Sequence, residues 1–309
     1  MDEHAPRSNS IDSSAAREWP LIARFKSAEA RLGDLAARRL WTARAYEFLR
    51  FGCKEAWACL FGGAMVALLI GTHLWYPASS ALARSDFLFL AALAIQIAML
   101  AIRLESFGEA RVILVYHVIG TIMEVFKTDV GSWKYIGTAF FHIGGVPLFS
   151  GFMYASIGSY LARCWRLFDF RFSGHPPLRA LALLAVAIYL NFYSHHYVPD
   201  ARIALIATTV FLFRSTWLHY RIWRTHRRMP LLLGLFLVAL FIWLAENIGT
   251  ATATWIYPHQ RAGWSVVKLG KLGSWFLLLI VSYALVAALN RPRALADSDQ
   301  LSCEKRSAM

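Results

Sequence analysis

Apolar runs of about 20 residues, separated by shorter polar segments, fill the chain from about residue 55 to residue 290. A run of that length, with almost no charge, matches what a helix needs to cross the hydrocarbon core of a bilayer. The pattern predicts an all-α fold, a polytopic membrane helix bundle of about eight transmembrane helices over residues 55–290. The predicted spans are 56–76, 86–103, 108–127, 144–163, 179–197, 202–219, 230–248 and 269–289.

The segments that flank this bundle are polar. Residues 1–17 contain several serines and show no periodicity, which predicts a disordered tail. In residues 18–54 apolar side chains such as Leu21, Phe25 and Leu32 recur at helical spacing among arginines, which predicts an amphipathic cytoplasmic helix. Such a helix could rest on the anionic inner leaflet, or it could pack on the bundle or on a second copy of the chain. Residues 291–309 form a predicted cytoplasmic tail.

Positive charge is distributed unevenly between the two sides of the predicted bundle. Lys and Arg concentrate in the N-terminal segment, in the loops after the fourth and sixth spans and in the C-terminal tail, and the alternate loops have fewer. Because Lys-rich and Arg-rich loops stay in the cytoplasm, both termini are predicted to be cytoplasmic and the protein to be a multi-pass protein of the cell inner membrane. The loop after the fourth span is predicted to begin at Arg163.

The composition supports lipid as the natural solvent of this chain. Hydrophobic residues make up 58% of the 309 residues and charged residues 17%, proportions that argue against a soluble protein. The formal net charge of +13 is explained by the topology, so we expect membrane lipid and no nucleic acid as a partner. The chain lacks P-loop, GxGxxG, GxSxG and CxxC motifs, and we therefore expect no cofactor.

Two segments match each other without a gap. Glu124–Tyr135 and Glu246–Tyr257 share Glu, Thr, Trp and Tyr at equivalent positions, and each segment follows a predicted span. The match predicts two parallel four-helix repeats, at about 55–165 and 178–290, that place both segments near the outer face.

The two glutamates are the main candidates for chemistry, because a carboxylate at the end of a membrane span is costly. One interpretation is acid/base catalysis or a proton relay, and the other is a structural pair that satisfies backbone groups at the span ends. His117, Glu124 and Thr128 share one helical face, whereas the position that matches His117 in the second segment is Ala239. This asymmetry suits one glutamate that titrates and one that binds or orients. Candidate catalytic residues are Glu124, Glu246 and His117.

Polar and aromatic residues near the same side form the candidate binding set. For the aromatic residues alone, an interfacial belt is the favoured interpretation. The neighbouring histidines could bind a metal, but the chain has no HxxxH or HxxHH cluster, so we expect no metal. The candidate substrate-binding residues are Thr128, Trp133, Tyr135, Thr250, Trp255, Tyr257, His195, His196 and Asn247.

Four longer motifs carry a resemblance to a known family. They begin at Gly120 (GTIMEVFKT), Gly145 (GVPLFSGFMY), Trp165 (WRLFDFRF) and Ala245 (AENIGT). With these motifs the chain resembles the YoaT-like family of bacterial integral membrane proteins, a domain of unknown function, over roughly residues 50–290. The resemblance implies a membrane protein and does not imply an activity.

A second resemblance is local. A span that ends in Glu, followed by Thr, Gly and Tyr and then by Gly-Val-Pro-Leu, is similar to membrane carotenoid hydratases and small lycopene cyclases. That resemblance implies a cofactor-independent lyase or isomerase that protonates a double bond of a lipophilic isoprenoid, with Glu124 as the proton donor and Glu246 as its partner. The enzyme is the favoured interpretation, because the titratable groups collect on one side apart from His117 and Arg214, whereas a transporter should carry them along a path through the membrane. Two other function classes stay open, a proton-coupled transporter and a non-catalytic membrane scaffold. The oligomeric state stays open as well.

Overall fold

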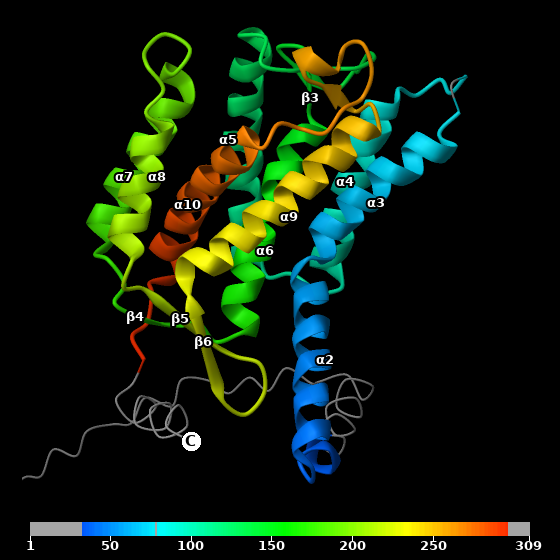
Figure 1. Ribbon diagram of the computed structural model, residues 1–309. Helices are drawn as coiled ribbons and strands as arrows, with labels where there is room; N and C mark the ends of the chain where they lie inside the picture. The colour runs from blue at the N-terminus through cyan, green and yellow to red at the C-terminus, as the bar shows by residue number, and fades with distance from the viewer. Residues whose placement is uncertain (1–32, 78, 296–309) are drawn as a thin grey trace, which may run out of the picture. The chain divides into compact units, whose positions relative to one another are not determined.

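The computed structural model describes residues 33–77 and 79–295 (Figure 1). The described residues divide into two compact units between Gly52 and Cys53. The predicted disordered tail and residues 18–32 of the predicted amphipathic helix lie outside the described residues, as do residues 296–309 of the predicted C-terminal tail. Within residues 33–54, helix α2 (Leu40–Ala58) begins at Leu40 and continues past the predicted boundary at residue 55.

All eight predicted spans contain a helix. Local sequence explains several of the helix starts: Ser106 and Glu109 form a capping box at the start of α5, and Pro177 and Pro230 immediately precede α7 and α9. The helices are α3 (Leu60–Trp75), α4 (Arg84–Ala101), α5 (Phe107–Asp129), α6 (Phe149–Leu167), α7 (Leu178–Ser194), α8 (Arg202–Phe213), α9 (Leu231–Ala251) and α10 (Gly270–Asn290).

Residues 33–77 and 79–295 are mostly helical, and three of the helices among them could cross a membrane. Helices α4, α9 and α10 are long and apolar enough, and α2 with α3 would add a fourth span if that bent pair is counted as one. Helices α7 and α8 are apolar but shorter. By length and apolar character the fold therefore supports three to four spans directly, fewer than the eight predicted.

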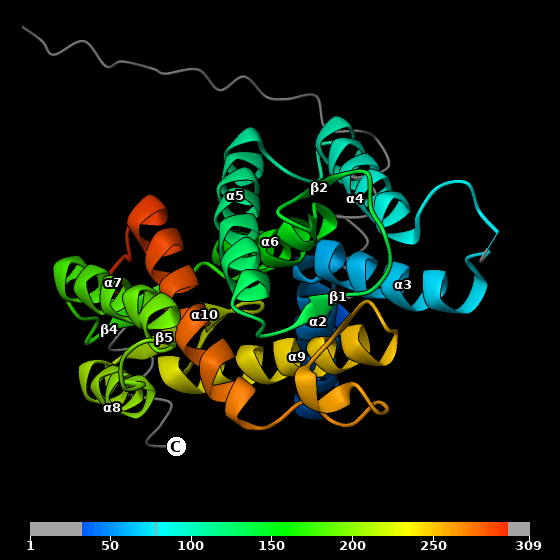
Figure 2. The ribbon, with the colours of Figure 1, turned by 90° about the horizontal axis from the view of Figure 1, so that it is seen from above.

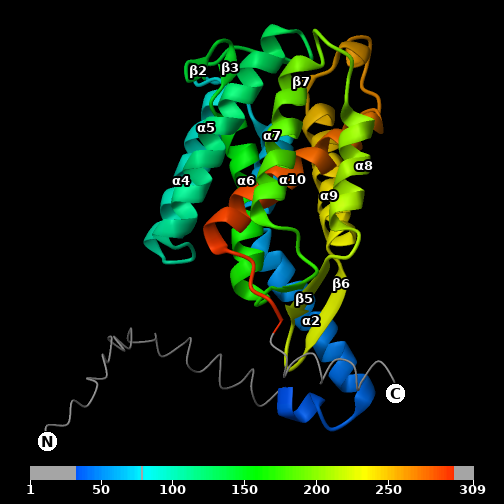
Figure 3. The same cartoon turned by 90° about the vertical axis from the view of Figure 1, so that its left-hand side faces the viewer.

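The prediction of an all-α fold needs a correction, because the described part of the chain also forms three small sheets. The largest contains β4 (Arg171–Ser173), β5 (Trp217–Arg221) and β6 (His226–Pro230), all antiparallel. The predicted sixth span, 202–219, was therefore too long. Helix α8 ends at Phe213, and the chain then pairs as a β-hairpin with Trp217 opposite Pro230, as Figures 1 and 3 show below α8 and α9.

The predicted start of the fourth span at residue 144 was also wrong. Gly144 and Gly145 have φ values of 56° and 77°, a left-handed conformation that glycine adopts without strain. They form the turn between β2 (His142–Ile143) and β3 (Val146–Pro147), and α6 begins afterwards at Phe149. The two glycines thus make a hairpin turn rather than a close helix contact.

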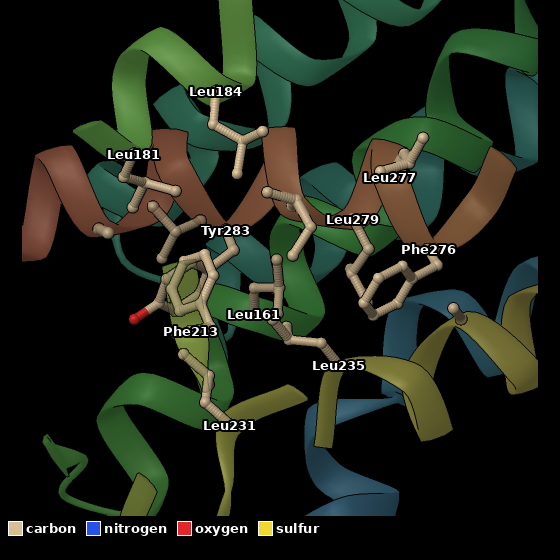
Figure 4. Close-up of a cluster of buried hydrophobic side chains, with 14 of the residues drawn as sticks. Leu161, Leu181, Leu184, Phe213, Leu231, Leu235, Phe276, Leu277, Leu279 and Tyr283 are labelled. Atoms are coloured by element: carbon tan, nitrogen blue, oxygen red, sulfur yellow. The ribbon is translucent and has the colours of Figure 1, made fainter. Parts of the chain in front are cut away.

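The largest buried apolar cluster lies among α6, α7, α9 and α10 (Figure 4). Leu181 and Leu184 of α7 face Leu279 and Tyr283 of α10, and Leu235 of α9 joins them. All five side chains are at most 5% exposed. This cluster fixes α10 against α9 and so fixes the helix ends on which the candidate site is built.

Helices α5 and α6 lie side by side and pack closely through glycines (Figure 2). A Cβ added at Gly120 would lie 2.6 Å from the Tyr154 side chain, and one added at Gly151 would lie 2.6 Å from Nδ1 of His117. Small residues at such positions allow helix backbones to approach closely. The close approach brings the side chains of α6 within reach of the polar face of α5.

A buried ion pair joins α6 to Glu105, two residues before the start of α5. Arg163 belongs to α6 and not to a loop, which corrects the sequence prediction. Its guanidinium donates to Glu105 at 2.7 Å, and both side chains are fully buried. Ser159 donates to the same carboxylate at 2.9 Å, and Gln96 also donates to it. Arg163 is therefore neutralised inside the protein.

Candidate functional site

Helices α5 and α9 end in the same backbone arrangement. In α5 the N–H groups of Gly131 and Ser132 donate to the carbonyls of Thr128 and Lys127, at 3.1 and 2.9 Å. In α9 the equivalent groups of Ala253 and Thr254 donate to Thr250 and Gly249, at 3.0 and 3.1 Å. This is the Schellman motif, in which the residue after the helix takes a positive φ. Gly131 and Ala253 have φ values of 73° and 51°.

The two matching segments then meet. Strand β1 (Lys134–Tyr135) pairs antiparallel with β7 (Trp255–Ile256), and Tyr135 lies opposite Trp255. Figure 2 labels β1 and Figure 3 labels β7, each near the helix end that it follows. The similarity found in the sequence thus corresponds to a direct contact, and both glutamates lie on the helices that lead into this pair of strands.

Glu124 is buried and accepts three hydrogen bonds. Its Oε2 accepts from Nε1 of Trp133 and from the hydroxyl of Tyr135, both at 2.7 Å. Its Oε1 accepts from the hydroxyl of Tyr154 of α6, at 2.8 Å. Hydrogen bonds from several donors favour the charged form of a carboxylate. The geometry therefore describes a carboxylate that is held in place by aromatic donors.

Glu246 has a related but different environment. The hydroxyl of Tyr257 donates to its Oε1 and Nε1 of Trp275, from α10, donates to its Oε2. Trp255 takes another place, because its indole lies against Gly249, where an added Cβ would be 1.9 Å from the ring. The same residue types therefore surround both carboxylates, but Trp133 is a donor whereas Trp255 is a packing residue.

Aromatic rings from the two segments interlock. The ring centroids of Trp133 and Tyr257 are 6.0 Å apart, and those of Tyr135 and Trp255 are 6.3 Å apart. The rings of Tyr154 and Trp275, which come from the helices that follow each segment, are 5.9 Å apart. Each pair therefore joins a ring of the first segment or α6 to a ring of the second segment or α10. We call these six rings with Glu124 and Glu246 the aromatic-carboxylate centre.

Lys271, in the first turn of α10, supplies the positive charge of this centre. Its Nζ lies 4.4 Å from the ring centroid of Trp133 and 4.6 Å from that of Tyr257. Electrostatic attraction links the ammonium to both Glu246 and Glu124. Within the part of the chain that the structure describes, Nζ makes no hydrogen bond, so the ring faces are its direct contacts.

The tyrosines in the loops of the centre are held as hydrogen-bond donors. Burial raises the pKa of Tyr135 well above its usual range, and the charge of Glu124 raises it further. Burial and the charge of Glu246 raise the pKa of Tyr257 in the same way. Both phenols therefore keep their protons around neutral pH and donate them to the carboxylates.

The remaining polar candidates in the second segment have local roles. Oδ1 of Asn247 accepts from the backbone N–H of Val267 at 2.9 Å, which ties the long loop after β7 to α9. Thr250 and Thr128 donate to backbone carbonyls of their own helices, and Thr250 also accepts from Nε1 of Trp264 at 3.1 Å. These contacts shape the segments around the centre, and the structure does not join these residues to either carboxylate.

The two neighbouring histidines belong to another cluster. Nζ of Lys127 lies 2.8 Å from Nε2 of His196 and 3.5 Å from Nε2 of His195, and it donates to the carbonyl of Phe192 at 2.7 Å. Burial and the charge of Lys127 lower the pKa of His196. The structure therefore places both histidines with a lysine, and gives them no direct contact with Glu124 or Glu246.

His117 lies on the predicted polar face of α5, beside Gly151. Its ring packs on Phe152, with centroids 4.5 Å apart, and its Nδ1 is buried without a hydrogen-bond partner among the described residues. It does not join the glutamates. Across residues 33–77 and 79–295, no group of three or more His, Cys, Asp or Glu side chains is arranged to hold a metal ion.

Three residues of the centre were not predicted as site residues. Tyr154, Trp275 and Lys271 come from the helices that follow the two segments, so the local match could not reveal them. One signal was available, because Tyr154 follows Glu124 by 30 residues and Trp275 follows Glu246 by 29. Extending the comparison into the next helix would have identified an aromatic donor in each half.

Comparison with known proteins gives a family without an assigned activity. A family model described as a protein of unknown function (DUF817) matches residues 47–283. The uncharacterised protein YoaT of Bacillus subtilis (strain 168) is 41% identical over 245 residues, which cover 79% of this chain and 92% of that protein. These matches confirm the YoaT-like resemblance, and neither concerns carotenoid hydratases or lycopene cyclases. No solved structure matches the chain significantly.

Proposed function

Because the chain belongs to the DUF817 family of proteins of unknown function, we propose its function from its own residues. We propose an integral inner-membrane transporter that couples solute movement to proton binding at Glu124 and Glu246. The proposal includes eight membrane-crossing helices, α3–α10, as two four-helix repeats with both termini cytoplasmic. The matched ends of α5 and α9, and a helix in each of the eight predicted spans, support this arrangement.

The charge balance of the aromatic-carboxylate centre carries the proposal. Glu124 and Glu246 are 4% and 5% exposed, and Lys271 is the cation whose charge acts on both. Arg202, another cation whose charge acts on Lys271, is itself paired with Asp200. Two carboxylates and one ammonium therefore leave the centre with one negative charge in excess. An uncompensated buried charge is costly, by several kcal/mol in order of magnitude. A proton on one carboxylate removes that cost, so the centre is suited to binding and releasing one proton.

The distribution of polar groups favours transport over a reaction at one place. A proton pathway needs polar groups at several depths, whereas an acid catalyst needs them only at the substrate. Starting from Glu105, which lies just before α5 and pairs with Arg163 of α6, the polar groups continue along α5 with His117, whose Nδ1 has no partner among the described residues, and then Glu124. These groups are spaced along the helices, which supports a route toward the centre.

A transient-current measurement tests the proposal without knowledge of the solute. The purified protein is reconstituted into liposomes on a solid-supported membrane, and the pH is changed in a rapid step. We expect a charge displacement in the wild type that is lost in Glu124→Gln and in Glu246→Gln. Asp129→Asn is the matched control, because Asp129 is an exposed carboxylate at the end of α5. A wild type without a charge displacement would reject the function.

One observation favours a second candidate function, acid-catalysed hydration or cyclisation of an isoprenoid lipid. The ring faces of Trp133 and Tyr257 already attract a positive charge, and a carbocation intermediate would need the same stabilisation. Mass spectrometry of lipid extracts from a deletion strain, the wild type and Glu124→Gln tests this candidate. Unchanged isoprenoids in the deletion strain would eliminate it.

A further inference from the structure

We propose that the solute of this centre is an organic ammonium ion, and that Lys271 occupies its place when the solute is absent. This inference deepens the proposed function, on which it rests. It concerns the chemical class of the solute and identifies Lys271 as a built-in competitor for the site.

Aromatic rings and carboxylates surround Nζ of Lys271. Aromatic faces within about 6 Å attract an ammonium, and such faces are how proteins recognise ammonium ligands. Nζ lies 4.4 and 4.6 Å from the rings of Trp133 and Tyr257, and both carboxylates attract it over a longer distance. A small ammonium ion in the same position would meet the same rings and the same negative charge.

Lys271 is held by fewer hydrogen bonds than Lys127. A lysine ammonium has three donors and commonly uses them in hydrogen bonds. In the described part of the chain Nζ of Lys271 uses none, whereas Lys127 donates to a backbone carbonyl at 2.7 Å and contacts His196. Lys271 lies in the first turn of α10 on a flexible four-carbon stem, so its ammonium can withdraw by a change of rotamer without unfolding the helix.

The charge balance of the aromatic-carboxylate centre links an incoming ammonium ion to the bound proton. With Lys271 in place, the two carboxylates still exceed the positive charge by one. When Lys271 withdraws, an incoming ammonium restores that balance and the proton can stay on its carboxylate. Proton binding and ammonium binding are therefore linked through the same two glutamates, which is the coupling that a proton-driven carrier of cations requires.

Titration with n-butylammonium chloride tests the inference, because this ion matches the lysine side chain beyond Cα. Intrinsic tryptophan fluorescence of the detergent-solubilised protein is followed at constant pH and ionic strength. We expect saturable binding to the wild type, and binding at least tenfold tighter to Lys271→Ala, in which the competitor is gone. Lys268→Ala, an exposed lysine one turn away, should behave like the wild type. In the double variant Lys271→Ala/Trp133→Leu the gain should disappear.

Two results would overturn the inference. One is binding of n-butylammonium to Lys271→Ala but not to the wild type, which would mean that the ion fills only the cavity left by the truncated side chain. The other is equal affinity in Lys271→Ala and the wild type. The transient current separates this inference from the proposed function: a normal proton-driven current without ammonium binding rejects the solute class and retains the proton site, whereas ammonium binding without a current rejects proton coupling.

Discussion

The segments around the two carboxylates share one backbone arrangement but differ in the number and source of their hydrogen-bond donors. Glu124 accepts three hydrogen bonds, and its own segment supplies the indole donor, Trp133. Glu246 accepts two, and its indole donor, Trp275, comes from the next helix, because Trp255 packs on Gly249 instead. One substitution explains this difference, since Gly249 occupies the position of Lys127. A glycine there admits an indole ring, whereas a lysine excludes it and contacts the two histidines that follow α7.

The largest loss of stability is expected for Gly249→Ala, which tests whether Trp255 packs on Gly249. The added Cβ would lie 1.9 Å from the Trp255 ring, and overpacking of this kind costs about 3 kcal/mol. We expect a strongly lowered midpoint of thermal unfolding, measured in detergent. Gly63→Ala in α3 is the control, because its Cβ would meet nothing within 4 Å. Equal stability of the two variants would mean that Trp255 does not pack on α9.

Glutamine substitutions should show which of the two carboxylates contributes more to the free energy of unfolding. Hydrogen bonds to a charged group are stronger than neutral ones, and Glu124→Gln weakens three where Glu246→Gln weakens two. We expect a loss of about 2 kcal/mol for Glu124→Gln and of about 1 kcal/mol for Glu246→Gln, from denaturant unfolding followed by tryptophan fluorescence. The opposite order would show that the number of donors does not determine how firmly each segment is held.

Acid sensitivity should separate the centre from the β4–β5–β6 sheet. Burial lowers the pKa of His219 in β5, and the nearby charges of His226 and Arg228 lower it further. The stability that neutral His219 provides is therefore complete above its unfolded pKa of about 6.5. It is lost as the pH falls through the lower pKa of the folded state. We expect His219→Gln to lose less thermal stability than the wild type between pH 7.5 and pH 5, and an equal loss would contradict this assignment.

The smallest expected effect concerns the residue that follows each helix. Ala253 takes a φ of 51° where the first segment has Gly131 at 73°. A residue with a Cβ is strained in that region by about 1 kcal/mol. Ala253→Gly should therefore stabilise the protein by up to about 1 kcal/mol, and Gly131→Ala should destabilise it by a similar amount, both measured as shifts in thermal unfolding. Shifts of the same sign would contradict the shared Schellman geometry.

The sequence predicted the helices of the bundle well, because runs of apolar residues about 20 long have few alternatives to a helix. It failed where short-range β-pairing intervenes, at Gly144–Gly145 and at Trp217–Arg221. Periodicity cannot distinguish the end of a helix from an apolar strand that follows it directly. Arg163 was misplaced for a related reason, since charge alone does not reveal a buried partner such as Glu105.

For the site, the repeated residues were sufficient to identify both glutamates and four aromatic residues of the centre. The structure adds the antiparallel pairing of β1 with β7, which depends on how the halves fold against each other. It also separates His195, His196 and His117 from the carboxylates, although their sequence positions had suggested a common cluster. Lys271 could not be predicted because its role depends on rings contributed by both segments.

The central claim is that Glu124, Glu246 and Lys271 form one electrostatic unit that holds one exchangeable proton. Infrared difference spectroscopy of the wild type and of Lys271→Met, recorded between high and low pH, tests it most directly. We predict one protonated carboxyl in the wild type that disappears in Glu124→Gln or Glu246→Gln, and a larger protonated carboxyl signal at neutral pH in Lys271→Met, because loss of the ammonium leaves two carboxylates to be neutralised. A carboxyl signal that is identical in Lys271→Met and the wild type would contradict the claim.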